Sequence, residues 1–497
     1  MLSPRLSHAV PVLVAAAAIA FAGCGGDDEA ASPLDEALGY LSEDAGFAFV
    51  ASTNLDDYGD LRQILDKFPF AGRAEDLLEQ SISQAGFDFE EDVEPLLGNP
   101  VVIGTDENAS FLDSESDTPF VMAIETEDAG KLEDLMTKDA RDAGESEGYD
   151  IYQGQQEDTW IAIKDEVLVL SDSEETLKDA LAQRGEDDRL TEDDVDAAFE
   201  DLPEDAPVKA YANVKSLLAA SPESEKALEV EWVDHIETFG LSADATDDGV
   251  ALDWSLRTDP EGLTDDDLPL ASGSEAPQLL ERDDGSAEIV LGLRDPAQIV
   301  DFALATAEVV DPAGFAEFGS AKQQVERRLG VDIDQDVLAQ LTGDVSAVVS
   351  IDGKFGARAE LDDAAAFDRT LAKIVEGLPE FSDDVTIAKA GGRYYTLSTE
   401  DGERYALGVA QGALVVASDL PTATQVASRA VVDAEGQEGA FVASADAEQL
   451  ANAALARLAG GLQGLGGSLF TGPLGDLLTS ASASTDGLTG RLELKIE

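Results

Sequence analysis

The chain has 497 residues and a formal net charge of −74, from 105 acidic and 31 basic side chains. Such a charge repels phosphate backbones and anionic lipid headgroups, which argues against nucleic acid as a partner. One cysteine and two histidines are too few for a Cys/His zinc site, a disulfide within the chain or an iron–sulfur cluster. We therefore expect no cofactor and no metal.

Residues 1–24 have the layout of an export signal. Arg5 supplies a positive charge, Ala9–Ala22 is uncharged, and the small residue Gly23 precedes Cys24. The uncharged run is shorter than the roughly 20 apolar residues of a membrane-spanning helix. The segment resembles the lipobox of bacterial lipoproteins, in which the cysteine sulfur receives a diacylglyceryl group. An uncleaved anchor and a secreted protein with a coincidental cysteine are the alternatives.

We accordingly predict a lipoprotein signal peptide over residues 1–23 and a flexible polar tether over 24–34. The diacylglyceryl group on Cys24 would hold the protein to the cell membrane, on its extracytoplasmic side. Two acyl chains are enough for stable anchoring, whereas one holds a protein only marginally.

The body of the chain is predicted to be two tandem, diverged copies of one α+β unit, an antiparallel sheet with packed helices. The first copy covers 35–258 and the second 278–497, and the stretch 259–277, rich in Asp, Gly, Ser and Pro, is the predicted linker. The matched segments are Gly86–Val93 with Gly330–Val337, Val101–Gly104 with Ser346–Ser350, Phe120–Glu125 with Phe355–Glu360, Trp160–Leu170 with Tyr405–Val416, and Leu241–Leu256 with Ser480–Ile496.

Local signals define the ends of these elements. Ser171-Asp172 and Ser418-Asp419 each follow a predicted hairpin, where their side chains would cap the first turn of a helix. Asp-Gly turns at Asp248-Gly249 and Asp486-Gly487 predict tight hairpins near the end of each copy. Alternation of apolar and polar residues predicts one buried and one wetter face for each sheet.

These segments carry a family resemblance. A lipobox followed by Asp88–Gly98, with its Asp92-Val93 and Pro95-Leu96-Leu97-Gly98, and by the hairpin Trp160–Asp172 resembles the bacterial envelope proteins grouped as domain of unknown function 3352. The resemblance would cover nearly all of the chain after the signal. It implies an architecture and a cell-envelope location, and no activity.

Asp332, Asp334 and Asp336 at alternate positions suggest calcium, but a helix-loop-helix calcium site needs a glycine soon after the third ligand, and Val337 stands there. We therefore expect Asp332 or Asp334 to cap a helix running to Leu341. The matching Asp88, Glu90 and Asp92 of the first copy are interpreted in the same way.

His235 is the one histidine after the signal. It is predicted on a helix on which Trp232 and Ile236 share a face, with His235 beside Asp234 on the polar side. No Gly-x-Ser-x-Gly elbow accompanies it, so a solvated or structural histidine is expected rather than a general base. The abundant carboxylates could supply the acid and base of a glycosidase, but the sequence singles out no pair.

The stretch Ala459–Leu478 alternates glycine with leucine. It is interpreted either as a flap that contacts lipid or an apolar pocket, or as a packed helix-loop-helix under the second sheet. The sequence thus favours a lipid-anchored cell-envelope protein that binds a ligand or partner and is not an enzyme. The alternatives are a carrier or chaperone for an apolar molecule and a carboxylate-dependent hydrolase.

Overall fold

The structure is a computed structural model that describes residues 32–68, 88–105, 119–126, 128–137, 140–154, 159–220, 226–283, 285–380, 385–399, 402–434, 436–458 and 473–497. Cys24, the predicted signal peptide and residues 459–472 of the glycine and leucine stretch lie outside the described residues. The chain divides into two compact units. Unit 1 comprises Met1–Pro222 and Ile236–Arg257, and unit 2 comprises Glu223–His235 and Thr258–Glu497.

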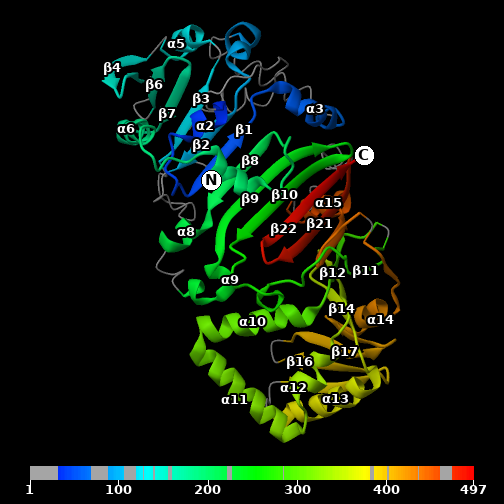
Figure 1. Cartoon of the computed structure of the whole chain (residues 1–497). Coiled ribbons are helices and arrows are strands. Elements are labelled where there is room, and N and C mark those ends of the chain that lie inside the picture. The colour runs from blue at the N-terminus through cyan, green and yellow to red at the C-terminus, as the bar shows by residue number, and fades with distance from the viewer. Residues whose placement is uncertain are drawn as a thin grey trace. The chain divides into compact units, whose positions relative to one another are not determined.

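Unit 1 is built on an antiparallel sheet with the strand order β4-β5-β6-β7-β3-β2-β1-β8-β9-β10. Strands β9 and β10 form a long hairpin and come last in this order (Figure 1). The strands are β1 Phe47–Ala51, β2 Val101–Thr105, β3 Val121–Glu125, β4 Arg141–Ser146, β5 Tyr149–Gln153, β6 Trp160–Lys164, β7 Val167–Ser171, β8 Val208–Asn213, β9 Ile236–Thr246 and β10 Gly249–Thr258.

Helices cover parts of both faces of the unit 1 sheet. On one face α2, α6 and α7 enclose a core that includes Leu38, Leu177 and Val195. On the other face α5 and η3 cover the β3, β7 and β6 side, where Leu132 and Leu96 pack on the strands. The helices are α2 Pro33–Leu38, α3 Gly59–Leu65, α5 Ala129–Thr137, α6 Glu174–Gln183, α7 Glu192–Phe199 and α8 Val214–Ala220, with short turns η1 Leu55–Tyr58, η2 Phe89–Val93 and η3 Glu94–Leu96.

Unit 2 is built on an antiparallel sheet with the order β15-β16-β17-β18-β14-β13-β12-β20-β21-β22. A small sheet pairs β11 with β19. The strands are β11 Leu279–Leu280, β12 Glu288–Leu293, β13 Val345–Ser350, β14 Phe355–Glu360, β15 Val385–Ala390, β16 Tyr394–Thr399, β17 Arg404–Ala410, β18 Ala413–Ala417, β19 Val431–Val432, β20 Phe441–Asp446, β21 Leu474–Ser484 and β22 Gly487–Ile496.

The two faces of the unit 2 sheet are covered by different elements. Helix α14 and the β11–β19 sheet enclose a core around Val290, Val348 and Val442 on one face, and α13 packs on the opposite face. The helices are α9 Glu231–Asp234, α10 Pro296–Val310, α11 Pro312–Leu329, α12 Ile333–Asp336, α13 Ala364–Gly377, α14 Leu420–Ser428 and α15 Ala447–Leu458, with short turns η4 Ala227–Glu229, η5 Asp265–Asp267, η6 Leu338–Gln340 and η7 Leu378–Glu380.

The predicted α+β class and the antiparallel pairing are confirmed. Residues 259–277, predicted as a linker, lie within unit 2. None of the helices in the described part of the chain is long and apolar enough to cross a membrane.

One of the two predicted helix caps is wrong. Asp419 caps α14, accepting a hydrogen bond from the Thr422 amide at 2.7 Å, as predicted. Before α6 the cap is Ser173 rather than Ser171 or Asp172, because strand β7 continues through Ser171, whose hydroxyl donates to the Phe120 carbonyl.

Candidate functional site

One face of the unit 2 sheet is apolar across its central strands and is open to solvent at β12 and β13. Residues paired directly across antiparallel strands share a face. The pairing registers place the following residues together on what we call the open apolar face of unit 2: Ile289, Leu291, Leu293, Val345, Ala347, Val349, Phe355, Ala357, Ala359, Phe441, Ala443, Ala445, Leu477, Thr479, Ala481, Leu492 and Leu494.

On β12 and β13 the exposed fraction of the side chains differs sharply between the two faces. Ile289 of β12 lies opposite Val349 of β13, and these residues are 37% and 39% exposed. Their neighbours on the opposite face, Val290 and Val348, are 2% and 6% exposed. A one-sided antiparallel sheet ordinarily presents polar residues to water, so an apolar exposed face indicates a binding surface.

Helix α13 covers this face at the β17 and β18 side, and the face is buried again at β20, where Ala443 and Ala445 are 6% and 2% exposed. Phe367 and Leu371 of α13 pack with Leu407, Val409 and Leu414 of the neighbouring strands β17 and β18. At the centre of the sheet, Leu291 and Leu293 keep intermediate exposure, as Ala347 does. The open apolar face therefore continues from a covered core into solvent-accessible surface.

Unit 1 has a comparable face. There the registers of β1, β2, β8 and β9 place a set of apolar side chains on the face opposite the α2, α6 and α7 core. Those with intermediate exposure are Phe47, Phe49, Val101, Ile103, Val208, Phe239 and Leu241. In unit 1 Val101 and Ile103 of this set pack against the core that α5 and η3 cover, so the face is less open than that of unit 2.

A second apolar surface lies on α10 and α11, which follow one another in unit 2 (Figure 1). Phe318 is 52% exposed and Val310 is 38% exposed. The centres of the Phe315 and Phe318 rings lie 6.4 Å apart. The centres of the Phe302 and Trp232 rings lie 6.1 Å apart, with the two rings edge to face. This surface competes with the sheet face as a place for an apolar partner.

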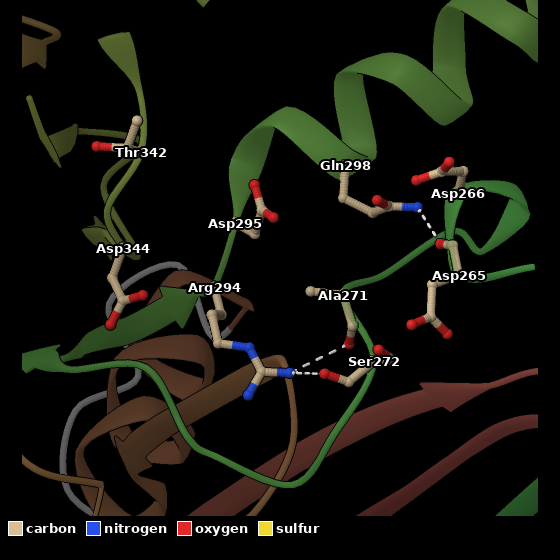
Figure 2. A pocket seen from close by; sticks show the side chains of 9 residues that line it. All are labelled: Asp265, Asp266, Ala271, Ser272, Arg294, Asp295, Gln298, Thr342 and Asp344. Atoms are coloured by element: carbon tan, nitrogen blue, oxygen red, sulfur yellow. Dashed lines mark hydrogen bonds between the residues drawn. The ribbon is translucent and has the colours of Figure 1, made fainter. Parts of the chain in front are cut away.

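Unit 2 also contains a polar cleft of about 480 Å³. Figure 2 shows that Arg294 points at the backbone of Ala271 and Ser272, to whose carbonyls its guanidinium donates. Gln298 donates to the carbonyls of Asp265 and Leu268 at 2.9 and 2.8 Å. The cleft is lined by Asp265, Asp266, Ala271, Ser272, Arg294, Asp295, Gln298, Thr342 and Asp344.

These contacts limit what the cleft can do. Arg294 and Gln298 hold the loop before β11 in place, so the groups left facing the cleft are mostly carboxylates. Asp344 accepts from the Gln278 amide at 3.2 Å. The lining residues include no histidine, cysteine or lysine. The cleft therefore offers acidic oxygens to a cation, and carboxylates are its candidate acid, base or nucleophile.

The capping role predicted for Asp332 is confirmed. Asp332 caps α12 by accepting from the Gln335 amide at 3.0 Å, and Asp336 accepts in return from the Asp332 amide at 3.0 Å. In unit 1 Asp92 accepts from the Asp88 amide at 2.8 Å, which matches the second of these bonds. The helix after Asp332 is shorter than predicted, because α12 ends at Asp336 and η6 follows.

Glu326, Asp332 and Asp334 bring carboxylate oxygens within 4.8 Å of one another. Each is already engaged. Glu326 accepts from the Ile333 amide at 3.2 Å, and Asp334 pairs with Lys322. The cluster is thus accounted for by helix capping and an ion pair.

His235 lies at the C-terminal end of α9 rather than within a longer helix. Its Nδ1 lies 2.8 Å from the Asp259 carbonyl oxygen, and its Nε2 lies 3.9 Å from a Glu231 carboxylate oxygen. Ile236 begins β9, so the predicted helical face shared by Trp232 and Ile236 is wrong. Both ring nitrogens of His235 have neighbours, which agrees with a structural role.

Comparison with known proteins identifies the family. The model of the family described as "Protein of unknown function (DUF3352)" matches residues 6–373. The chain belongs to this family. No curated protein matches it.

Solved structures similar to this DUF3352 chain include crystal forms IV, III and I of TP0453. Their sequence identities are 10%, 9% and 11%, and they cover 44%, 46% and 46% of this chain and 80%, 82% and 79% of their own. The TM-score is 0.26 in each case, which carries no argument about function.

Sequence reasoning missed the open apolar face of unit 2 in this DUF3352 protein, although the sequence contains the alternating apolar residues that form it. In the run Glu288–Leu293, Ile289, Leu291 and Leu293 alternate with Glu288 and small or apolar residues. The alternation predicts a strand, but only the pairing with β13 and β20 shows that Glu288 is on the buried face.

The polar cleft has no signal in the sequence, because its residues come from three separate segments of the chain.

Proposed function

We propose that this DUF3352 protein is a lipid-anchored component of the bacterial cell envelope that binds a ligand or partner without catalysing a reaction. The observation that carries the binding role is the open apolar face of unit 2, with Ile289 and Val349 exposed on its neighbouring strands β12 and β13. The lipobox at Cys24 supports the location.

The location is tested by Cys24→Ser in the native host. The expected result is that the variant is released from the membrane fraction or keeps its signal peptide, because no sulfur remains to accept the diacylglyceryl group. A variant that still fractionates with the membrane as a processed protein would contradict the lipid anchor.

The non-catalytic role is supported by the residue inventory and by the engagement of His235 with Asp259. Its rival is a carboxylate-dependent hydrolase, for which the acidic cleft around Asp295 and Asp344 is the natural place. A glycan-hydrolysis screen decides between them. Activity abolished by Asp295→Asn or Asp344→Asn would overturn the non-catalytic proposal.

A second candidate function is a carrier for an apolar molecule, and the same open apolar face favours it. Native mass spectrometry of the chain bearing Cys24→Ser tests this candidate, since the protein's own acyl anchor is then absent. A co-purifying lipid mass supports the carrier, and a clean apo mass counts against it.

We also propose that units 1 and 2 are diverged copies of one ancestral unit. Their strand orders support this, because replacing each strand of unit 1 by its counterpart in chain order reproduces the order of unit 2 when β11 and β19 are set aside. The matching Asp88–Asp92 and Asp332–Asp336 hydrogen bonds are a second support. A crystal structure with a different strand order in either unit would contradict the duplication.

A further inference from the structure

We propose that the open apolar face of unit 2 binds a long acyl chain. The proposal rests on the carrier candidate above, and it names the ligand and its place.

The distribution of charged side chains over the two faces of the sheet indicates the class of ligand. In the paired stretches of β12, β13, β14, β20, β21 and β22, the open face has no charged side chain, although 105 acidic residues occur in the chain. The charged residues of these stretches alternate onto the opposite face. They are Glu288, Arg358, Glu360, Asp446, Asp476, Arg491 and Glu493.

An uncharged face complements an uncharged partner. A polar or ionic ligand would lose its hydration on this surface without gaining hydrogen bonds, which is unfavourable. A protein partner would need hydrogen bonds as well as apolar contacts, and Thr479 is the one hydrogen-bonding side chain among the face residues. An acyl chain needs neither charge nor hydrogen bonds.

The dimensions of the open apolar face suit an extended acyl chain. Neighbouring strands lie about 4.8 Å apart, so β14, β13 and β12 offer a strip about 10 Å wide, which ends at β20 where Ala443 and Ala445 are buried. Each methylene buried on such a strip raises affinity about fourfold. The exposed Ile289–Val349 pair stands inside this strip, two strands or fewer from β14, and is therefore expected to contribute directly.

The test is a titration of the full chain bearing Cys24→Ser with cis-parinaric acid, a fatty acid whose fluorescence rises in an apolar site. Ile289→Thr combined with Val349→Thr adds two hydroxyls to the face while keeping β-branched side chains. We expect saturable binding by the parent and about tenfold weaker binding by the double variant. Val432→Thr is the matched control, because Val432 is 41% exposed on β19, outside the face, and is expected to bind as the parent does.

Circular dichroism and thermal unfolding show whether the variants fold, so that a loss of binding is assigned to the face. No saturable binding by the folded parent, or equal binding by parent and double variant, would overturn the proposal. So would a concentration-dependent dimer that the double variant dissociates and that excludes the probe, because the face would then be a self-association surface. These outcomes leave the Cys24→Ser fractionation result, and hence the envelope proposal, unaffected.

Discussion

At the residue scale, a buried ion pair stands out in unit 2. The Arg429 side chain is 5% exposed and pairs with Glu288, 8% exposed, at 2.7 Å, and also with Asp283. Removing one partner of a buried pair leaves the other charge desolvated and uncompensated. The network joins the end of α14 to the start of β12 on the covered face of the sheet.

We predict that Arg429→Ala lowers the free energy of unfolding of unit 2 by about 3–5 kcal/mol, because Glu288 is left buried without its guanidinium. The matched control is Arg282→Ala. Arg282 is 28% exposed and pairs with Asp476, 44% exposed, at 2.6 Å, so its loss is expected to cost about 1 kcal/mol or less. Urea unfolding measures both, and equal losses would show that burial does not control the energetics of these pairs.

The Arg429–Glu288 ion pair could not be predicted from the sequence. The capping roles of Asp332 and Asp419 followed from local chemistry alone, whereas the strand beginning at Glu288 was not among the predicted elements. Arg429 and Glu288 are 141 positions apart, and no local pattern predicts that a glutamate on a strand faces the interior.

At the element scale, close packing of α7 on β9 depends on one glycine. A Cβ built on Gly240 would lie 2.2 Å from the Ala198 carbonyl oxygen of α7, which is backbone and cannot move aside without shifting the helix. At Gly59, the first residue of α3, an added Cβ meets nothing within 4 Å.

We predict that Gly240→Ala destabilises unit 1 by about 1–3 kcal/mol through overpacking. Gly59→Ala is the matched control and is expected to leave the stability close to that of the parent. Thermal unfolding of the two variants checks this. A Gly240→Ala protein as stable as the Gly59→Ala protein would contradict the close approach of α7 to β9.

Elements fixed by local signals were predictable, and elements fixed by long-range pairing were not. The hairpins around Gly249 and Gly487 form as predicted. Leu474–Leu478, by contrast, was interpreted as part of a flap or of a helix-loop-helix, and that interpretation is wrong for these residues. They belong to β21, because Leu477 and Leu478 pair with both β20 and β22, and such pairing overrides local composition.

At the scale of the whole molecule, both units bury tyrosines, and among the described residues the largest rises in phenol pKa lie in unit 1. Burial raises the pKa of Tyr58 and of Tyr211 to about 12, and burial together with the hydrogen bond to Tyr149 raises the pKa of Tyr40 as well. All three tyrosines lie in unit 1. An unfolded tyrosine loses its proton near pH 10, while the folded phenols keep theirs to higher pH.

The stability of unit 1 is expected to fall at high pH. The contribution of these phenols is fully present below pH 10 and is lost as the pH rises from about 10 toward 12, because the unfolded state ionises first and is then favoured. We predict that unit 1 loses thermal stability over this range. Thermal unfolding combined with tyrosinate absorbance measures it, and ionisation of these tyrosines near pH 10 with unchanged stability would contradict the burial.

The central claim is that an acyl chain lies on the open apolar face of unit 2. Photo-cross-linking of the Cys24→Ser chain with a diazirine-bearing fatty acid, followed by peptide mass spectrometry, tests it most directly. The account predicts cross-links in β12 and β13, at Ile289, Leu291 and Val349. Cross-links confined to the exposed α10 and α11 surface around Val310 and Phe318, or spread without preference, would contradict it.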